Sequence, residues 1–403
     1  MRVKTFYLLF LILLGSCISE EVVTITVKNN SSKIRKNASV TILLSELISQ
    51  RAQKYSSISF KDVKTNKTYT SQLVDENGDG EKESVLFQPT IKANSTNEYE
   101  VVFSNEKLNL KNNDITTYSR FVPERIDDYT WENDKVAFRT FGPKAQLLFE
   151  EDRMEGKDKG TISSGIDCWL KRVNYLVIDS WYKKYTENTG TYHEDTGEGL
   201  DSYHVGKSRG CGGIGVWDTL NKKIIVSKNF TTWKTIDIGS IRTSFALDYA
   251  PWEANGTLIK EQKIISLDLG SHLSKYEVVF SGLDTVKEIT IGLTLHDKSG
   301  VVNINEKEGW FRYWETIKGT EVGTGVVVDP KYIVGHTKHI VEEKDESHIL
   351  IHLKPIDGKI VYYTGYGWKE SLYFSSEKEW DSYLANYAKD IKQSLEVKIK
   401  KSK

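Results

Sequence analysis

The segment YHEDTGEGLDSYHVGKSRGCGG, residues 192–213, gathers side chains that can move protons and bind anions. His193, Tyr203 and Tyr192 can transfer protons, and Arg209 can bind a carboxylate through parallel N–H groups. The segment is rich in glycine and has neither a helical nor an alternating apolar pattern. Because ordering such backbone costs conformational entropy, we expect it to serve catalysis or binding, with an ordinary surface histidine as the alternative for His193.

Two further segments are dense in functional side chains: RFVPERIDDYTWENDKVAFRTFGP, residues 120–143, and SGIDCWLKR, residues 164–172. Each lies at the edge of a predicted strand, so a sandwich of sheets can bring all three segments together over one groove. In that groove, tryptophan faces would stack on a sugar ring and basic side chains would bind its carboxylate. The expected substrate-binding residues are Arg209, Arg172, Lys171, Trp131, Glu132 and Trp169.

This combination of side chains suits elimination from a uronic acid. Removing the proton beside a carboxylate places a second negative charge on that group, so an enzyme must neutralise it with cations or a metal. A histidine or tyrosine then acts as the base, and an acid protonates the departing oxygen. We expect no required cofactor. The sequence has no GxSxG motif, and its many loop acids single out no carboxylate pair for glycoside hydrolysis.

Overall charge and composition narrow the partners. The chain has 403 residues, and its 55 Lys and Arg nearly balance its 56 Asp and Glu. This balance lacks the basic footprint of nucleic-acid binding, so we expect no nucleic-acid partner. The expected partner is a uronate-containing oligosaccharide, bound by a monomer.

The N-terminus has the layout of an export signal. Arg2 and Lys4 precede an apolar run that ends in Leu14-Gly15-Ser16-Cys17, and this run is too short to span a bilayer. The ending resembles a bacterial lipoprotein signal, in which the cysteine becomes the lipidated first residue. We therefore expect lipidation at Cys17 and an exported lipoprotein in the periplasm or on the outer membrane of a Gram-negative bacterium, held to the membrane by the lipid alone. A secretory signal cleaved near Cys17 is the alternative.

Short β-branched and aromatic runs, separated by turn residues, recur along the chain and predict an all-β fold of sheets packed face to face. One window has helical period, near the C-terminus, where Ser376 and Glu379 form a capping box and Trp380 begins an apolar stripe. We expect this helix to pack on a sheet. The expected organisation is a signal peptide over residues 1–16, an N-terminal β-sandwich part over 17–110, and a main catalytic part over 111–403.

The turn DENGDGEKE offers alternating oxygen ligands at Asp75, Asn77 and Asp79, with Glu83 as a further candidate. This pattern suits a structural Ca²⁺, although the twelfth-position glutamate of an EF-hand is missing. A solvated hairpin turn is the alternative.

The three segments above, followed by IRTSFALDYAPWE, resemble a family of bacterial exported proteins catalogued as a domain of unknown function. The resemblance covers about residues 22–395. Members of that family occur with enzymes that degrade uronate-containing polysaccharides such as ulvan and pectin, and include an ulvan oligosaccharide dehydratase. The family is also similar to the galactose-mutarotase-like supersandwich, which implies a large β-sandwich here.

The resemblance implies a carbon–oxygen lyase, an oligosaccharide dehydratase that removes water from a non-reducing-end uronic acid and leaves a 4,5-unsaturated uronosyl end. An endo-acting polysaccharide lyase performs the same elimination with a glycosidic oxygen leaving. A non-catalytic surface glycan-binding lipoprotein needs the aromatics and cations but no proton-transfer pair.

Overall fold

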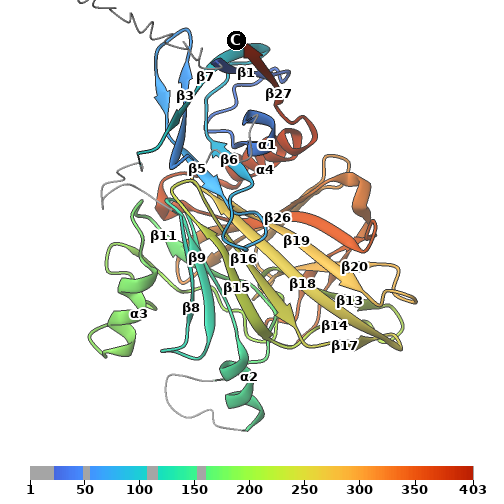
Figure 1. Cartoon of the computed structure of the whole chain (residues 1–403). Helices are drawn as coiled ribbons and strands as arrows, with labels where there is room; N and C mark the ends of the chain where they lie inside the picture. Colours follow the sequence, from blue (N-terminus) through green and yellow to red (C-terminus); the bar gives the residue numbers. More distant parts are fainter. Residues whose placement is uncertain (1–21, 49–54, 107–116, 152–159, 403) are drawn as a thin grey trace, which may run out of the picture.

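The computed structural model describes residues 22–48, 55–106, 117–151 and 160–402. These residues form a small β-rich unit, at the top of Figure 1, and a large unit of extended antiparallel sheets below it. The prediction of a large all-β sandwich with a C-terminal helix packed on a sheet is confirmed. Within the described ranges, no helix is both long and apolar enough to cross a membrane.

The small unit packs a five-stranded sheet against a three-stranded sheet. The first sheet has the order β27 (Glu396–Ser402), β1 (Val22–Asn29), β7 (Ser95–Ser104), β3 (Ser57–Asp62), β4 (Thr68–Tyr69). The second has the order β2 (Val40–Leu43), β6 (Ser84–Phe87), β5 (Ser71–Val74), and the short helix α1 (Leu44–Leu47) follows β2. Buried side chains such as Ile25, Phe60 and Phe87 form its core.

The last strand of the chain belongs to this small unit. β27 pairs antiparallel with β1, with Ile399 opposite Ile25. The predicted division into residues 17–110 and 111–403 therefore differs from the structure at its C-terminal end. Local patterns could not reveal this, because pairing between the two ends of a chain leaves no trace in the spacing of either strand.

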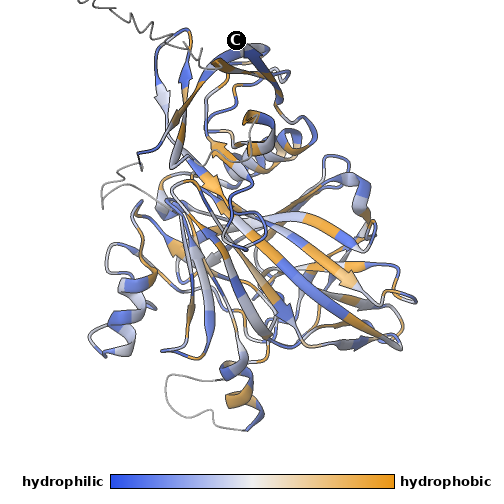
Figure 2. Ribbon diagram, viewed as in Figure 1, coloured by the Kyte–Doolittle hydropathy of each residue, from blue (hydrophilic) through white to orange (hydrophobic). Residues whose placement is uncertain are grey.

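The large unit contains one nine-stranded sheet and two five-stranded sheets. The nine-stranded sheet has the order β15 (Phe230–Ile238), β16 (Arg242–Tyr249), β18 (Thr257–Asp268), β19 (Leu273–Ser281), β26 (Lys359–Trp368), β23 (Thr320–Val328), β22 (Trp310–Ile317), β21 (Val301–Asn305), and β17 (Trp252–Ala254) pairs with β18. Every second residue of β18 is buried, and Figure 2 shows the mixture of hydrophobic and hydrophilic residues along the strands of this sheet.

The two five-stranded sheets cover the rest of the core. One has the order β14 (Lys223–Ile225), β13 (Cys211–Asp218), β20 (Ile289–Thr294), β25 (His348–Leu353), β24 (Ile333–His339). The other has the order β12 (Gly199–Leu200), β11 (Asp167–Lys171), β10 (Ala137–Thr140), β9 (Asp128–Glu132), β8 (Tyr118–Val122). One hydrophobic cluster, which includes Trp131, Phe245 and Ile291, runs through all three sheets and joins them into one body.

The C-terminal helix α4 (Glu377–Lys392) packs Trp380 and Leu384 against β22 and β23. Glycines on β23 make this close approach possible, because a Cβ at Gly323 would lie 2.7 Å from Trp380 and one at Gly325 would lie 2.8 Å from Leu384. The predicted capping box is not formed by Ser376. Glu379 instead accepts hydrogen bonds from the N–H and hydroxyl of Ser375.

Three short helices were not predicted, because their apolar positions span too few turns to establish a helical period. They are α1, α2 (Pro143–Glu150) and α3 (Ile178–Thr186), and two turns of 3₁₀ helix lie at Pro330–Tyr332 and Lys369–Ser371. Helix α3 buries Trp181, Tyr182 and Tyr185 and lies beside β8 and β9 in Figure 1.

Candidate functional site

A buried group of two arginines and three aspartates, here called the Arg139 cluster, lies on the sheet formed by β8 to β12. Arg139 on β10 donates to Asp167 on β11 at 2.5 and 3.0 Å and to Asp201 at 2.9 Å. Arg125 holds Asp128 of β9 through two hydrogen bonds of 3.0 Å. The three segments singled out in the sequence do therefore meet, and the antiparallel register places Arg139 directly opposite Asp167.

The Arg139 cluster carries one more carboxylate than guanidinium, and Arg139 and its three aspartates are buried. Burial, together with the charge of Asp201, raises the pKa of the Asp167 carboxyl to about 7. The Oδ1 atom of Asp167 has no hydrogen-bond partner among the described residues. A proton shared within the cluster near neutral pH offsets the excess negative charge.

This excess predicts a pH-dependent stability. The folded-state pKa of Asp167 lies above its ordinary value of 3.8, so the folded state binds more protons than the unfolded state between 3.8 and about 7. The resulting contribution to stability is present at low pH and is lost as pH rises through about 7. We expect the melting temperature of the wild type to fall between about pH 5 and about pH 8 by more than that of Asp167→Asn, which cannot ionise. Parallel slopes for the two proteins would contradict this.

Aromatic rings cover the Arg139 cluster, and His193 lies at its rim. Arg139 Nη1 donates to the Tyr192 hydroxyl at 3.3 Å, and the Tyr192 ring contacts His193 at 4.6 Å between centroids. His193 Nδ1 lies 3.2 Å from the backbone oxygen of Asp201, and 46% of the histidine side chain is exposed. Burial, and then the charge of Arg139, lower the pKa of His193 against the opposing bond to Asp201, so its ring is neutral at neutral pH.

The continuation of the same segment, residues 202–206, borders a second group of polar residues. His204 Nδ1 lies 2.6 Å from Asp345 Oδ2, the histidine side chain is 59% exposed, and the aspartate is buried. Both residues line a cavity of about 300 Å³, hereafter the His204 pocket. A neutral ring that donates from Nδ1 to Asp345 carries its lone pair on Nε2, which can then act as a base.

His296 forms the inner wall of the His204 pocket. Its Nδ1 lies 2.7 Å from Glu315 Oε1 and its Nε2 lies 2.8 Å from the backbone oxygen of His204. Burial opposes a charge here, but the hydrogen bond and the charge of Glu315 outweigh it and raise the pKa of His296. Both partners are acceptors, which favours the doubly protonated ring. The backbone φ of His296 is +35°, an uncommon conformation for a histidine and one that clusters at functional sites.

Two lysines complete the lining of the His204 pocket. Lys318 and Lys344 come from the β22–β23 turn and from the loop before β25, respectively, and both line the cavity. Burial raises the pKa of Asp201, and the charge of Lys318 is among the cations that oppose this rise, so the pocket and the Arg139 cluster are electrostatic neighbours. Asp297, Glu315 and Asp345 line the same cavity, and Glu315 and Asp345 are paired with His296 and His204. The arrangement places a histidine whose Nε2 has no hydrogen-bond partner among the described residues beside two lysines, which suits a ligand that loses a proton next to a carboxylate.

Lys171 and Glu132 do not line the site, contrary to the sequence-based prediction. Lys171 Nζ lies 2.6 Å from Glu132 Oε2, and both side chains are fully buried. The glutamate also accepts hydrogen bonds from the N–H groups of Val177 and Ile178 at the start of α3. Each of these charges is therefore paired within the fold, where the two residues hold α3 against β9.

Three other predicted substrate-binding residues are buried as well. Trp131 and Trp169 are buried in hydrophobic clusters, and the Trp131 indole donates to Ser274 at 2.9 Å. Arg209 is buried and donates to Ser164 at 2.9 Å. Burial lowers the pKa of its guanidinium to about 10. Both faces of β9 and β11 are covered and Arg209 precedes β13 in the interior, so a sugar cannot reach any of the three in this conformation.

The predicted tyrosine bases are buried as well. Burial raises the pKa of both Tyr203 and Tyr192, which makes them poor bases at neutral pH. The Tyr203 ring packs edge-on against His296 at 4.7 Å. Arg172 is half-buried, pairs with Asp195 and lies 4.7 Å from the ring of Trp368. Of the predicted site residues, His193 and Arg172 keep the greatest access to solvent.

Sequence reasoning missed Glu315, His296 and Asp345, and gave His204 little weight. These residues come from β22, from the turn after β20 and from the loop before β25, respectively. No local motif connects them. The one signal in the sequence was His204 itself, in the same segment as His193 and beside Tyr203.

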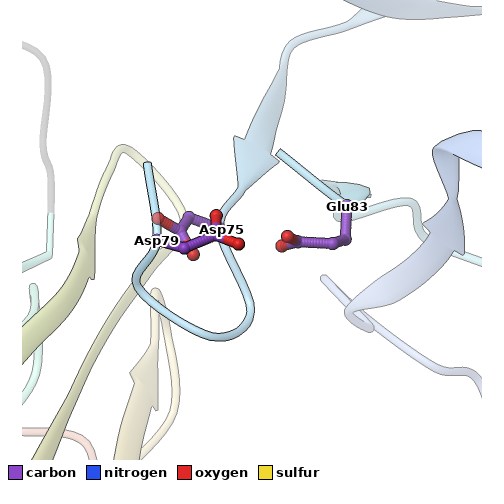
Figure 3. Close-up of side chains that lie close together, drawn as sticks. All are labelled: Asp75, Asp79 and Glu83. Atoms are coloured by element: carbon purple, nitrogen blue, oxygen red, sulfur yellow. The ribbon is translucent and has the colours of Figure 1, made fainter. Parts of the chain in front are cut away.

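The predicted calcium turn folds as a compact loop between β5 and β6. The carboxylate of Asp75 accepts N–H groups from Asn77 at 3.1 Å and Gly80 at 2.7 Å. One ligand atom from each of Asp75, Asp79 and Glu83 lies within 4.8 Å of the others, and Figure 3 shows the three carboxylates around the loop. Oxygen ligands at this spacing fit a hard cation such as Ca²⁺.

Calcium binding at this turn stays a prediction. We expect the melting temperature to rise when Ca²⁺ replaces a chelator, because a ligand bound only by the folded state stabilises it by about 2.7 kcal/mol at about 100 times its Kd. The double variant Asp79→Asn/Glu83→Gln should lose the Ca²⁺-dependent shift. Identical melting curves of the wild type in Ca²⁺ and in chelator would favour the alternative, a solvated turn that binds no Ca²⁺.

Comparison with known proteins places this chain in a family. A family model described as Domain of unknown function (DUF4861) matches residues 27–397, and the chain belongs to this family. It is 43% identical over 376 residues to "Uncharacterized protein P7" of Formosa agariphila, with 93% of each chain covered.

Two solved structures from Enterococcus faecalis are similar over most of this chain. A protein in the glycosyl hydrolase family 38 has 8% sequence identity to this chain and a TM-score of 0.48. The match covers 96% of this chain and 48% of that protein. An alpha-mannosidase from strain V583 has 9% sequence identity and a TM-score of 0.45. The match covers 95% of this chain and 46% of that protein. The chain thus spans about half the length of these two proteins.

Proposed function

We propose that the protein is a carbohydrate lyase of the dehydratase type. It removes water from the non-reducing-end uronic acid of an oligosaccharide derived from an ulvan- or pectin-like polysaccharide, and leaves a 4,5-unsaturated uronosyl end. The observation that carries the proposal is the His204 pocket, where a histidine oriented by buried Asp345 faces a cavity that Lys318 and Lys344 also line. The family that the sequence resembles includes an oligosaccharide dehydratase, and this resemblance supports the same activity.

The side chains of the pocket can supply each part of this reaction. The lysines bind the uronate carboxylate and offset the second negative charge that develops on it. His204 Nε2 takes the proton from C5, the C5–H and C4–O bonds break, and a C4=C5 double bond forms. The protonated ring then gives its proton to the departing C4 oxygen, which leaves as water. One histidine suffices when both groups leave from the same face of the sugar.

The half-buried His296 supports this chemistry by holding the backbone of His204. Its Nε2 donates to the backbone oxygen of His204, and its Nδ1 is paired with Glu315. It therefore acts as a positioning residue. The reaction needs no redox partner, and no cofactor is part of the proposal.

Product analysis tests the proposal. Purified protein is incubated with oligosaccharides that carry a uronic acid at the non-reducing end, and the products are measured by mass spectrometry and by absorbance of the unsaturated uronate. We expect the loss of one water per molecule without chain shortening. Shortened chains would instead identify an endo-acting lyase, and unchanged ligand with measurable affinity would identify a glycan-binding protein. Reduced oligosaccharides whose terminal carboxylate is converted to an alcohol serve as the control and should not react.

Export and anchoring belong to the same proposal. The lipidation site Cys17 and the signal over residues 1–16 lie outside the described residues, so these assignments stay predictions from sequence. An exported lipoprotein would meet oligosaccharides in the periplasm or at the outer membrane, where the products of polysaccharide cleavage accumulate. The lipid then serves only to localise the enzyme.

A further inference from the structure

A second cavity, larger than the His204 pocket, lies where three parts of the molecule meet. It has a volume of about 570 Å³ and is bounded by the segment before β2, by β18, β19 and β26 of the nine-stranded sheet, and by the last turns of α4. We call it the interunit cleft. It shares no lining residue with the His204 pocket. Its volume is in the range of pockets that hold small-molecule and sugar ligands.

One wall of the interunit cleft is aromatic. Tyr387 lies 5.1 Å from Tyr363 and 6.0 Å from Tyr383 between ring centroids, and all three rings line the cavity while half-buried. Two of the rings come from α4 and one comes from β26. Partly exposed tyrosine faces of this kind present an apolar surface with a polar edge, which is the surface that sugar rings stack on.

The lining is also positively charged. Arg242 is paired with Asp268 at 2.6 Å, and Arg35 is paired with Asp390 at 3.0 Å, so these four charges offset one another. Lys36 is exposed and, among the residues that the structure describes, makes no ion pair.

Lys275 adds a second cation to this lining. Its ammonium lies 3.4 Å from Glu277, but that carboxylate is bound more closely by Lys359 at 2.6 Å. Together with Lys36 it leaves the cleft with an excess of positive charge that faces solvent.

Hydrogen bonds between the small unit and the rest of the molecule fix the walls of the interunit cleft. Gln88 of the small unit donates to the backbone oxygen of Leu269 at 2.9 Å, and Arg35 donates to the backbone oxygen of Gln393 at 2.9 Å. The walls are therefore fixed before a ligand arrives, which lowers the entropic cost of binding.

We infer that the interunit cleft is a binding site for a chain of anionic sugars, separate from the His204 pocket. The tyrosine wall stacks on sugar rings, and Lys36 and Lys275 bind carboxylate or sulfate groups. The site goes beyond the proposed reaction, because it would retain a polysaccharide chain at a distance from the pocket where a chain end reacts.

Hydrogen exchange can locate this binding. The full-length protein is mixed with a polygalacturonate fragment, and amide exchange is followed by mass spectrometry. We expect slower exchange in residues 35–41 and 387–395, and no such protection by a neutral malto-oligosaccharide of equal length. The double variant Lys36→Ala/Lys275→Ala should lose the protection and raise the Kd by about tenfold or more, because charge-assisted contacts are lost.

The control is the double variant Lys64→Ala/Lys260→Ala, which removes two exposed lysines that do not line the cleft. An unchanged Kd in Lys36→Ala/Lys275→Ala, or an equal loss in the control, would overturn the inference. Water loss from the oligosaccharide without protection of the cleft would overturn it while leaving the proposed function standing. Protection of the cleft without any product would support the inference and would overturn the proposed function.

Discussion

Replacing His204 with alanine should lower the turnover of a uronate-ended oligosaccharide by roughly 10²-fold or more, the usual contribution of a general acid or base. The imidazole is held by Asp345 with its Nε2 free, so its removal leaves the C5 proton without a base. Binding should change little, because Lys318 and Lys344 still face the carboxylate. Steady-state kinetics should therefore show a loss of kcat with a nearly constant KM.

A matched variant sharpens this experiment. His193→Ala removes the other exposed histidine of the same segment, whose Nδ1 faces the backbone of Asp201 instead of a buried carboxylate at hydrogen-bond distance. We expect this variant to keep more activity than His204→Ala. Full turnover in His204→Ala together with a loss in His193→Ala would move the base to the rim of the Arg139 cluster. The His204 side chain is 59% exposed but its partner Asp345 is buried, so the melting temperature of His204→Ala must be measured beside its turnover.

Replacing Arg139 with methionine should lower the free energy of unfolding by about 3–5 kcal/mol, the usual cost of removing one partner from a buried ion pair. The variant leaves Asp167 and Asp201 buried without their guanidinium. Urea denaturation at neutral pH measures the loss. The loss should shrink toward about pH 5, because carboxylates without a cation take up protons more readily and then need no counter-charge.

Arg172→Met provides the control for this measurement. Arg172 also pairs with an aspartate, Asp195, but both side chains are about one-third exposed. A pair that is open to solvent contributes about 0–1 kcal/mol, so this variant should be close to wild type. Equal losses in the two variants would show that the Arg139 cluster has no special role in stability.

The fold class was predictable from the sequence because strand patterns are local. Alternating β-branched and aromatic runs predicted the all-β fold, and the stripe beginning at Trp380 predicted α4. The pairing of β27 with β1 was not predictable, since it joins residues 368 to 380 positions apart. Helix α3 was missed because its start is stabilised by Glu132 from a distant strand, and no capping residue marks it in the sequence.

The site was predictable at the level of segments but not of side chains. Residues 120–143, 164–172 and 192–213 do converge, because β9, β10, β11 and β12 are neighbours in one sheet. Which side chains are exposed depends on what packs on each face of the sheet. Both faces of β9 and β11 are covered, so Trp131 lies in the core between the sheets and Trp169 lies in the cluster beside α3.

The catalytic candidates themselves depend on longer connections. His204 gains its significance from Asp345, which follows it by 141 residues. No spacing rule covers such a distance, whereas the sheet topology settles it.

The pairing of β27 with β1 has a consequence for how the protein is made. Strand β1 leaves the ribosome long before β27, so it cannot gain this neighbour until residues 396–402 have been synthesised. Until then, β1 presents an open sheet edge, which is a template for pairing with other chains. The small unit can therefore close only after β27 has been made, and a chain that lacks these residues would be prone to aggregation. The lysines at positions 398, 400 and 401 place charge on the strand that finally covers this edge, which discourages further strand addition.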